Sequence, residues 1–210
     1  MPKVSVLMTN YNGWMYIAEA IESILWQTFT DFELIIVDDG SSDESWEIIQ
    51  KYAENDGRIR CYKNEKNSGI SVTRNRLIDL AQWEYFAWLD SDDRAKPERL
   101  KKQVKFLEKN PWYGIIGSWM MLIDTEGKEK GVKQLPISDQ EIRKQWYMRN
   151  SLNHPTLMMT RECIKKLVSM IAIWMGQKIM TFEYEQGCIF HFSTYQKFSQ
   201  NIEFTPAMLP

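Results

Sequence analysis

The sequence predicts an α/β domain whose central sheet is mostly parallel and is flanked by helices. Apolar runs of strand length alternate four times with segments in which apolar residues recur at helical spacing. Each expected helix lies between two expected strands, which is the connection that parallel strands need. The hydrophobic share of 44% over 210 residues is sufficient for one core.

The first half of the chain supplies these elements in regular order. Apolar residues between Ile17 and Leu25 have the i, i+3, i+4 spacing of an amphipathic helix. Ser41 and Glu44 have the spacing of a capping box, and Pro97 suits the first turn of a helix. In chain order we expect strands at 4–9, 33–37, 58–62 and 85–89, and helices at 17–25, from the capping box to about 55, at 71–81 and from 97 to about 110.

The pattern changes beyond this point. Gly114–Ile123 and Val132–Leu135 look like a strand pair joined by the turn Asp124–Gly127. Ser138, followed three residues later by a glutamate, caps another short helix, and Leu157–Thr160 is expected to be a further strand.

Composition excludes several classes of function. The net charge of −2 gives no indication of nucleic-acid binding, and the two histidines exclude chemistry built on several histidines. Cys61, Cys163 and Cys188 form no C-x-x-C pair, which is typical of a reducing compartment and not of a zinc site. We expect no signal peptide and no membrane span, and therefore a cytoplasmic protein.

Two clusters of carboxylates follow apolar strands. Asp38 and Asp39 follow the second expected strand, and Asp90, Asp92 and Asp93 follow the fourth. Ligands of open α/β sheets bind where parallel strands end, and neighbouring carboxylates repel one another unless a cation or donors compensate. Hard oxygen ligands suit Mg²⁺ or Mn²⁺, so the pattern indicates a divalent metal that holds a phosphorylated ligand.

Simpler interpretations of these residues also exist. Asp38 or Asp39 could cap the next helix, and Asp93 could favour a helix dipole. Arg74 and Arg76 could form a solvated helix face, although Arg74 could equally reach a phosphate.

The turn after the first strand, Thr9-Asn10-Tyr11-Asn12-Gly13, lacks the G-x-G-x-x-G pattern of dinucleotide binders. A polar turn with an aromatic side chain suits a nucleoside, because Tyr11 offers its ring to a base. Alternatively, Asn12-Gly13 is only a turn and Asn10 a local cap.

Taken in order, these motifs resemble glycosyltransferase family 2, whose members have the GT-A fold. The likeness covers roughly residues 2–167 and rests on the following segments: 2–12, 27–34, 37–43, Arg74-Asn75, 89–93 and His154-Pro155-Thr156. It implies a Rossmann-like nucleotide half and the inverting transfer of a sugar from a nucleoside-diphosphate donor, of UDP type, to a saccharide or lipid-linked acceptor. Cell-surface polysaccharide biosynthesis and peripheral association with the inner face of a membrane are implied as well.

The resemblance also implies roles for individual residues. Thr9, Tyr11, Asp38 and Asp39 would contact the nucleoside, with Asp39 at the base edge. Arg74 would hold the nucleotide. Asp90, Asp92 and Asp93 would form the D-x-D-type cluster for Mn²⁺ or Mg²⁺, with Asp92 also at the nucleotide.

The likeness stops near Val168. Family members continue with a Gly-Gly-Tyr-Asp-like turn and an acidic stretch that supplies the general base, and nothing in 168–210 matches either; Glu183 and Glu185 lack the spacing. A shifted reading frame over Met175–Phe182 permits Gly-Ala-Glu-Asp-Tyr-Asp. We infer that 168–210 is an out-of-frame tail, that the acceptor half is incomplete and that the general base is missing.

Two other functions remain open from the sequence alone. The chain could be an inactive remnant that only binds a nucleotide-sugar. It could also be a metal-dependent phosphotransfer domain, although it lacks a well-placed companion Lys and Thr.

Overall fold

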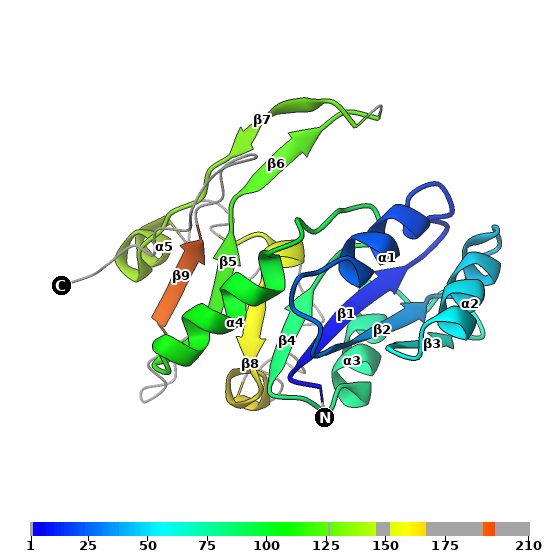
Figure 1. Ribbon diagram of the computed structural model, residues 1–210, viewed down its shortest axis with the longest axis horizontal. Coiled ribbons are helices and arrows are strands. Elements are labelled where there is room, and N and C mark those ends of the chain that lie inside the picture. Colours follow the sequence, from blue (N-terminus) through cyan, green and yellow to red (C-terminus); the bar gives the residue numbers. More distant parts are fainter. Residues whose placement is uncertain (1, 126, 146–151, 167–190, 196–210) are drawn as a thin grey trace. The chain divides into compact units, whose positions relative to one another are not determined.

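The computed structural model describes residues 2–125, 127–145, 152–166 and 191–195 (Figure 1). The chain divides after Lys101 into two compact units. The tail predicted at 168–210 lies outside the described residues except for 191–195, so its origin stays a prediction.

The first unit is a four-stranded parallel sheet with helical crossovers (Figure 1). Its strands lie in the order β3-β2-β1-β4. The chain order is β1 (Val4–Asn10), α1 (Ile17–Leu25), β2 (Phe32–Asp38), α2 (Ser45–Asn55), β3 (Ile59–Lys63), α3 (Ile70–Leu80), β4 (Tyr85–Trp88) and α4 (Arg99–Lys109), the last of which crosses the unit boundary. These findings confirm the predicted alternation and the parallel pairing.

The order of the strands determines where a ligand can bind. The chain runs outward from β1 through β2 to β3 and then returns to place β4 on the other side of β1. With right-handed crossovers, α3 therefore covers the face opposite to α1 and α2, and it packs on β1 and β2. The strand order thus reverses between β1 and β4, the position at which open α/β sheets bind ligands.

Burial on both faces explains why the central strands have no polar alternation. Every residue from Phe32 to Val37 is buried, as are Val4 to Met8. Parallel strands covered by helices on both faces read as continuous apolar runs, as the sequence does here.

The second unit has a mixed arrangement. β5 (Tyr113–Ser118) pairs antiparallel with β8 (Met158–Thr160) and parallel with β9 (His191–Tyr195). β6 (Met120–Ile123) and β7 (Glu129–Lys133) form a separate hairpin, and α5 (Asp139–Gln145) follows it. Among the helices in the described part of the chain, none is long and apolar enough to cross a membrane.

Several predicted boundaries are wrong. The expected strand 114–123 is divided at Trp119, which is buried and donates its indole N–H to Leu135 O at 2.7 Å. β7 begins before Val132 and ends before Leu135. The last predicted strand begins at Met158, because a short 3₁₀ turn, His154–Thr156, precedes it. The Ser138 cap is confirmed, since Glu141 N donates to Ser138 Oγ at 3.2 Å.

The predicted capping box at Ser41 is also wrong. α2 begins four residues later, at Ser45, and its N-cap, Glu44, makes no side-chain capping bond. The Ser41 hydroxyl is instead used at the end of β2, where it donates to Asp38 Oδ1 at 2.5 Å.

A buried glutamine joins α1 to α4 within the first unit. Gln27 Nε2 donates to Lys96 O at 2.7 Å and to Ser23 O at 3.0 Å, and Gln27 Oε1 accepts from Leu100 N at 3.0 Å. Only 4% of Gln27 is exposed. Without this side chain, the buried N–H of Leu100 would lose its acceptor.

We predict that Gln27→Ala lowers the free energy of unfolding by about 1–3 kcal/mol, the typical cost of buried polar groups that lose their partners. The control is Gln50→Ala, on the exposed surface of α2, which should change it by less than about 0.5 kcal/mol. Urea denaturation of both variants measures the difference. Equal stabilities of the two variants would contradict this role of Gln27.

Candidate functional site

The ends of β1, β2 and β4 bring the predicted residues to one edge of the first sheet. In the parallel register Asn10 lies opposite Asp38, and Leu7 lies opposite Trp88. The turns that follow β1, β2 and β4 therefore leave the sheet at the same edge, at the point where the strand order reverses.

Asp38 joins the first two of these turns. Its Oδ1 accepts hydrogen bonds from Asn10 Nδ2 at 2.8 Å and from Ser41 Oγ, and its Oδ2 accepts from Ser41 N at 2.9 Å. Ser41 Oγ in turn accepts from Asn12 N at 2.9 Å. Asp38 is fully buried, so its geometry favours holding the turns in place over direct contact with a ligand.

Asp39 points toward a different set of donors. Its Oδ1 accepts from Asn64 Nδ2 at 2.6 Å and from Ser68 N at 2.9 Å, and its Oδ2 accepts from Gly69 N at 2.9 Å. Burial raises the pKa of this carboxyl, but the hydrogen bonds from Ser68, Asn64 and Gly69 outweigh burial and leave the pKa below its usual value. Asp39 is therefore an ionised, fixed acceptor.

Gly40 allows the loop that supplies these donors to approach. It adopts φ +72°, and a Cβ on it would lie 2.7 Å from Lys66 C and 2.8 Å from Asn67 N. A side chain at this position would push away the segment that carries Ser68 and Gly69.

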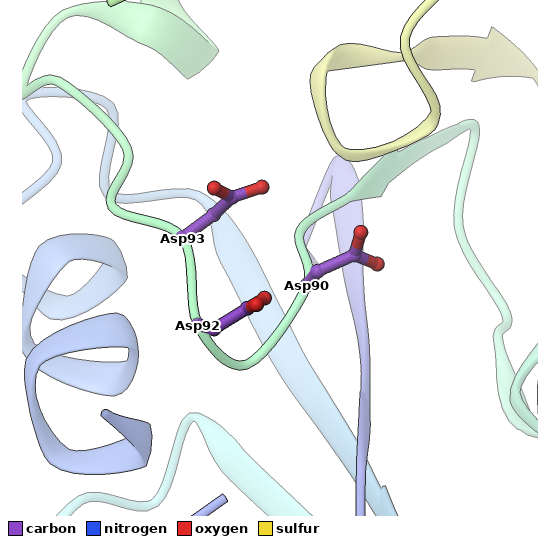
Figure 2. Close-up of side chains that lie close together, drawn as sticks. All are labelled: Asp90, Asp92 and Asp93. Carbon is purple, nitrogen blue, oxygen red and sulfur yellow. The ribbon is translucent and has the colours of Figure 1, made fainter. Parts of the chain in front are cut away.

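Asp90, Asp92 and Asp93 form the second part of the site, which we call the acidic turn (residues 90–93). Asp93 N donates to Asp90 O at 3.1 Å, and one carboxylate oxygen from each of the three side chains lies within 4.8 Å of the others (Figure 2). Burial raises the pKa of Asp93 to about 6, with further contributions from the charges of Asp92 and Asp90. Three crowded carboxylates fit Mg²⁺ or Mn²⁺, because hard cations prefer oxygen ligands and would relieve this repulsion.

Two arginines lie against the acidic turn. Arg99 is buried and donates from Nη2 to Trp88 O at 2.7 Å; burial lowers its pKa to about 10, and the charges of Asp93 and Asp90 offset part of that effect. Arg74, on α3, places its Nη2 3.6 Å from Asp90 Oδ1. Its Nε–H is a buried donor with no acceptor among the described residues.

The structure thus brings most of the predicted site residues to one edge. Thr9 is half-buried at the end of β1, and the ring of Tyr11 is half exposed in the turn that follows. Asp39, Arg74 and the acidic turn have the contacts given above. The ligands of these residues stay predictions, and burial assigns Asp38 an indirect part.

Sequence reasoning missed several residues of the site. Asn64, the first residue after β3, binds Asp39, and the same strand-end pattern that selected the aspartates could have selected it. Arg99 occupies the buried face of α4 together with Leu100 and Gln103, and a charged residue within that apolar periodicity was the available signal.

We predict that Asp93→Asn raises the melting temperature of the metal-free protein at pH 7. The folded-state pKa of Asp93 lies above the ordinary value of 3.8, so the folded state binds more protons than the unfolded state between pH 3.8 and about 6. Stability therefore falls as pH rises through this window, and the loss is complete above it. The asparagine removes this loss.

Thermal melting at pH 7 and at pH 4 measures the effect, which should be smaller at pH 4. Asp79→Asn, on the exposed surface of α3, is the matched control. A melting temperature at pH 7 that is equal to or below that of the wild-type protein would contradict the crowding of charge in the acidic turn.

Comparisons with known proteins agree with this geometry. The model of the glycosyl transferase family 2 matches residues 5–168. An uncharacterized glycosyltransferase of Methanocaldococcus jannaschii is 40% identical over 169 residues, which are 79% of this chain and 58% of that protein. The putative teichuronic acid biosynthesis glycosyltransferase TuaG of Bacillus subtilis is 40% identical over 124 residues, 59% of this chain and 49% of that protein.

Solved structures show the same fold. The crystal structure of S. aureus TarS in complex with UDP matches 78% of this chain and 48% of that chain, with a TM-score of 0.65 and 26% identity. The chain spans about half the length of the curated relatives that it matches. The mostly parallel sheet, the fold likeness and the family match lead to one conclusion: the chain belongs to glycosyl transferase family 2 and has the GT-A fold.

Proposed function

We propose that this protein transfers a sugar, with inversion, from a nucleoside-diphosphate donor to a saccharide or lipid-linked acceptor. The observation that carries the proposal is the meeting of two different carboxylate groups at one sheet edge. Asp39 is ionised and held by donors, whereas the acidic turn is crowded with negative charge. The first suits a base that donates a hydrogen bond, and the second suits a cation with a diphosphate.

Each part of the donor has a corresponding group. Asp39 would accept from the base, and the exposed ring of Tyr11 would stack against it, with Thr9 beside it at the end of β1. Arg74 would donate its buried Nε–H to a phosphate oxygen. Asp38 would act indirectly, through Ser41 and Asn10.

The carboxylates of Asp90, Asp92 and Asp93 would hold Mn²⁺ or Mg²⁺. Such an ion, when bound, supplies positive charge that stabilises a leaving diphosphate. Arg99 and Arg74 keep the acidic turn in place from the protein side.

Similar proteins support a UDP-type donor and a role in cell-surface polysaccharide biosynthesis. TarS has been crystallised with UDP, and TuaG is described as a teichuronic acid biosynthesis glycosyltransferase. A lipid-linked acceptor would place the protein at the inner face of a membrane as a peripheral, cytoplasmic enzyme. A nucleic-acid partner is not part of the proposal.

We also propose that residues 1–167 form the family unit and that 168–210 is an out-of-frame tail without the general base. The sequence observation that favours this boundary is the loss of all family-like motifs after Val168. On this proposal the chain binds its donor but lacks the group that deprotonates an acceptor, which is also what the alternative function, an inactive remnant, requires.

We predict that the protein binds UDP in a metal-dependent way and that Asp92→Asn weakens binding about tenfold, the order expected for one charge-assisted contact. Calorimetry with Mn²⁺ and with EDTA measures both effects. Asp31→Asn, in an exposed position before β2, should bind as the wild-type protein does. Equal affinity in Mn²⁺ and EDTA would refute the role of the acidic turn.

We predict slow hydrolysis of a UDP-sugar donor and a rate of acceptor transfer that is roughly 10²–10⁴-fold below that of a frame-restored protein, the usual contribution of a general base. The comparison needs both versions of the gene, a UDP-sugar and a saccharide acceptor. Equal transfer rates in the two proteins would show that the base is present in this chain and that the tail is a divergent acceptor lobe. Donor binding without any hydrolysis would favour the remnant.

A further inference from the structure

A chain of polar contacts leads away from Asp39 to a residue outside the predicted site. Asn64 Nδ2 lies 2.6 Å from Asp39 Oδ1, and Asn64 Oδ1 accepts a hydrogen bond from Arg76 Nη1 at 2.5 Å. Asn64 directly follows β3, and Arg76 lies on α3, two residues beyond Arg74. From the sequence alone, Arg76 could be a solvated charge.

The chemistry of the three groups determines how the amide is oriented. An ionised carboxylate only accepts hydrogen bonds, and a guanidinium only donates them. The Asn64 amide lies between the two, so its oxygen must face Arg76 and its NH₂ group must face Asp39. The reverse orientation would place the amide oxygen against the carboxylate and the NH₂ group against the guanidinium. Arg76 therefore determines which end of Asn64 the carboxylate meets.

Arg76 is itself held in position. The same Nη1 atom donates to Lys63 O at 3.1 Å, and the guanidinium carbon lies 5.7 Å from the centre of the Tyr62 ring. The Tyr62 hydroxyl accepts from Arg60 Nη2 at 2.9 Å, and Arg60 Nη1 binds Glu33 Oε2 on β2 at 2.8 Å. These contacts attach Arg76 to the body of the sheet, although its side chain is only half-buried.

The contacts of Asp39 leave little capacity for a ligand. Oδ1 accepts from both Asn64 and Ser68, and Oδ2 accepts only from Gly69. A carboxylate oxygen can accept two hydrogen bonds, so one acceptor position remains, on Oδ2. A uracil has an N–H donor at N3 for this position, whereas a cytosine has an acceptor there.

We propose that Arg76 is a positioning residue which, through Asn64, fixes Asp39 as a pure acceptor and so determines the preference for a uracil over a cytosine nucleotide. The inference rests on the proposed function, because it assumes that Asp39 faces the base. Arg76 does not touch the ligand in this account. Its effect is transmitted by the orientation of one amide.

The experiment measures the ratio of affinities for UDP and CDP by calorimetry, with Mn²⁺ present throughout. In the wild-type protein UDP should bind more tightly. Arg76→Met should lower the ratio roughly threefold to tenfold, the effect expected when one hydrogen bond is weakened. Arg76→Lys, which keeps a charged donor, should restore part of the ratio. A loss of stability alone would not change the ratio between two ligands that differ only in the base.

The matched control is Arg58→Met. Arg58 also combines a carboxylate, Asp56 at 2.7 Å, with an aromatic ring, Phe32 at 4.7 Å from the guanidinium carbon, but it has no contact with Asn64. The control should keep the wild-type ratio even if it lowers the melting temperature as much as Arg76→Met does.

A double-mutant cycle shows whether both residues act through one route. Asn64→Ala should lower the ratio by the same factor as Arg76→Met, and the double variant should lower it no further. An unchanged ratio in Asn64→Ala overturns the inference, whether or not Arg76→Met folds. Additive effects of the two changes overturn it as well.

The outcomes separate this inference from the proposed function. A wild-type protein that binds UDP and CDP equally refutes the base-reading role of Asp39 and the inference together. A wild-type protein that discriminates, while Arg76→Met keeps the full ratio, refutes the inference alone.

Discussion

The buried carboxylate of Asp38 holds together the edge on which the site depends. A fully buried charge is costly unless hydrogen bonds satisfy it, and Asp38 accepts three of them from Asn10 and Ser41. These bonds fasten the turn after β1 to the turn after β2. Asp38 O also accepts from Asn64 N at 2.8 Å, which attaches the segment after β3 as well. The positions of Asn64 and of the Asp39 donors follow from this arrangement.

Two kinds of carboxylate environment then lie at the same sheet edge and suit different chemistry. Hydrogen bonds outweigh the cost of burial at Asp39, so the pKa of its carboxyl is lowered and the group is ready to accept. Asp93 has burial and two like charges against it, so its pKa is raised to about 6. The first environment is complete within the protein. The second is incomplete without a cation, which is typical of functional sites.

The sequence predicted the parallel half of the fold well because each element has a local cause. Continuous apolar runs gave β1, β2 and β4, and helical spacing gave α1. The division of the strand at Trp119 depends on a bond to Leu135, sixteen residues away, and no local pattern indicates it. Ser41 was assigned to a helix cap by its spacing, but Asp38 in the same turn uses its hydroxyl. The acidic turn was evident from charge alone, whereas the link from Arg76 to Asp39 joins two elements and needed coordinates.

The most direct test of the account is a crystal structure of the protein with UDP and Mn²⁺. The account predicts the uracil N3 within hydrogen-bonding distance of Asp39 Oδ2, the ion bound to carboxylates of the acidic turn, and the diphosphate between the ion and Arg74. A nucleotide bound away from the edge formed by β1, β2 and β4, or an ion bound without any carboxylate of the acidic turn, would contradict it.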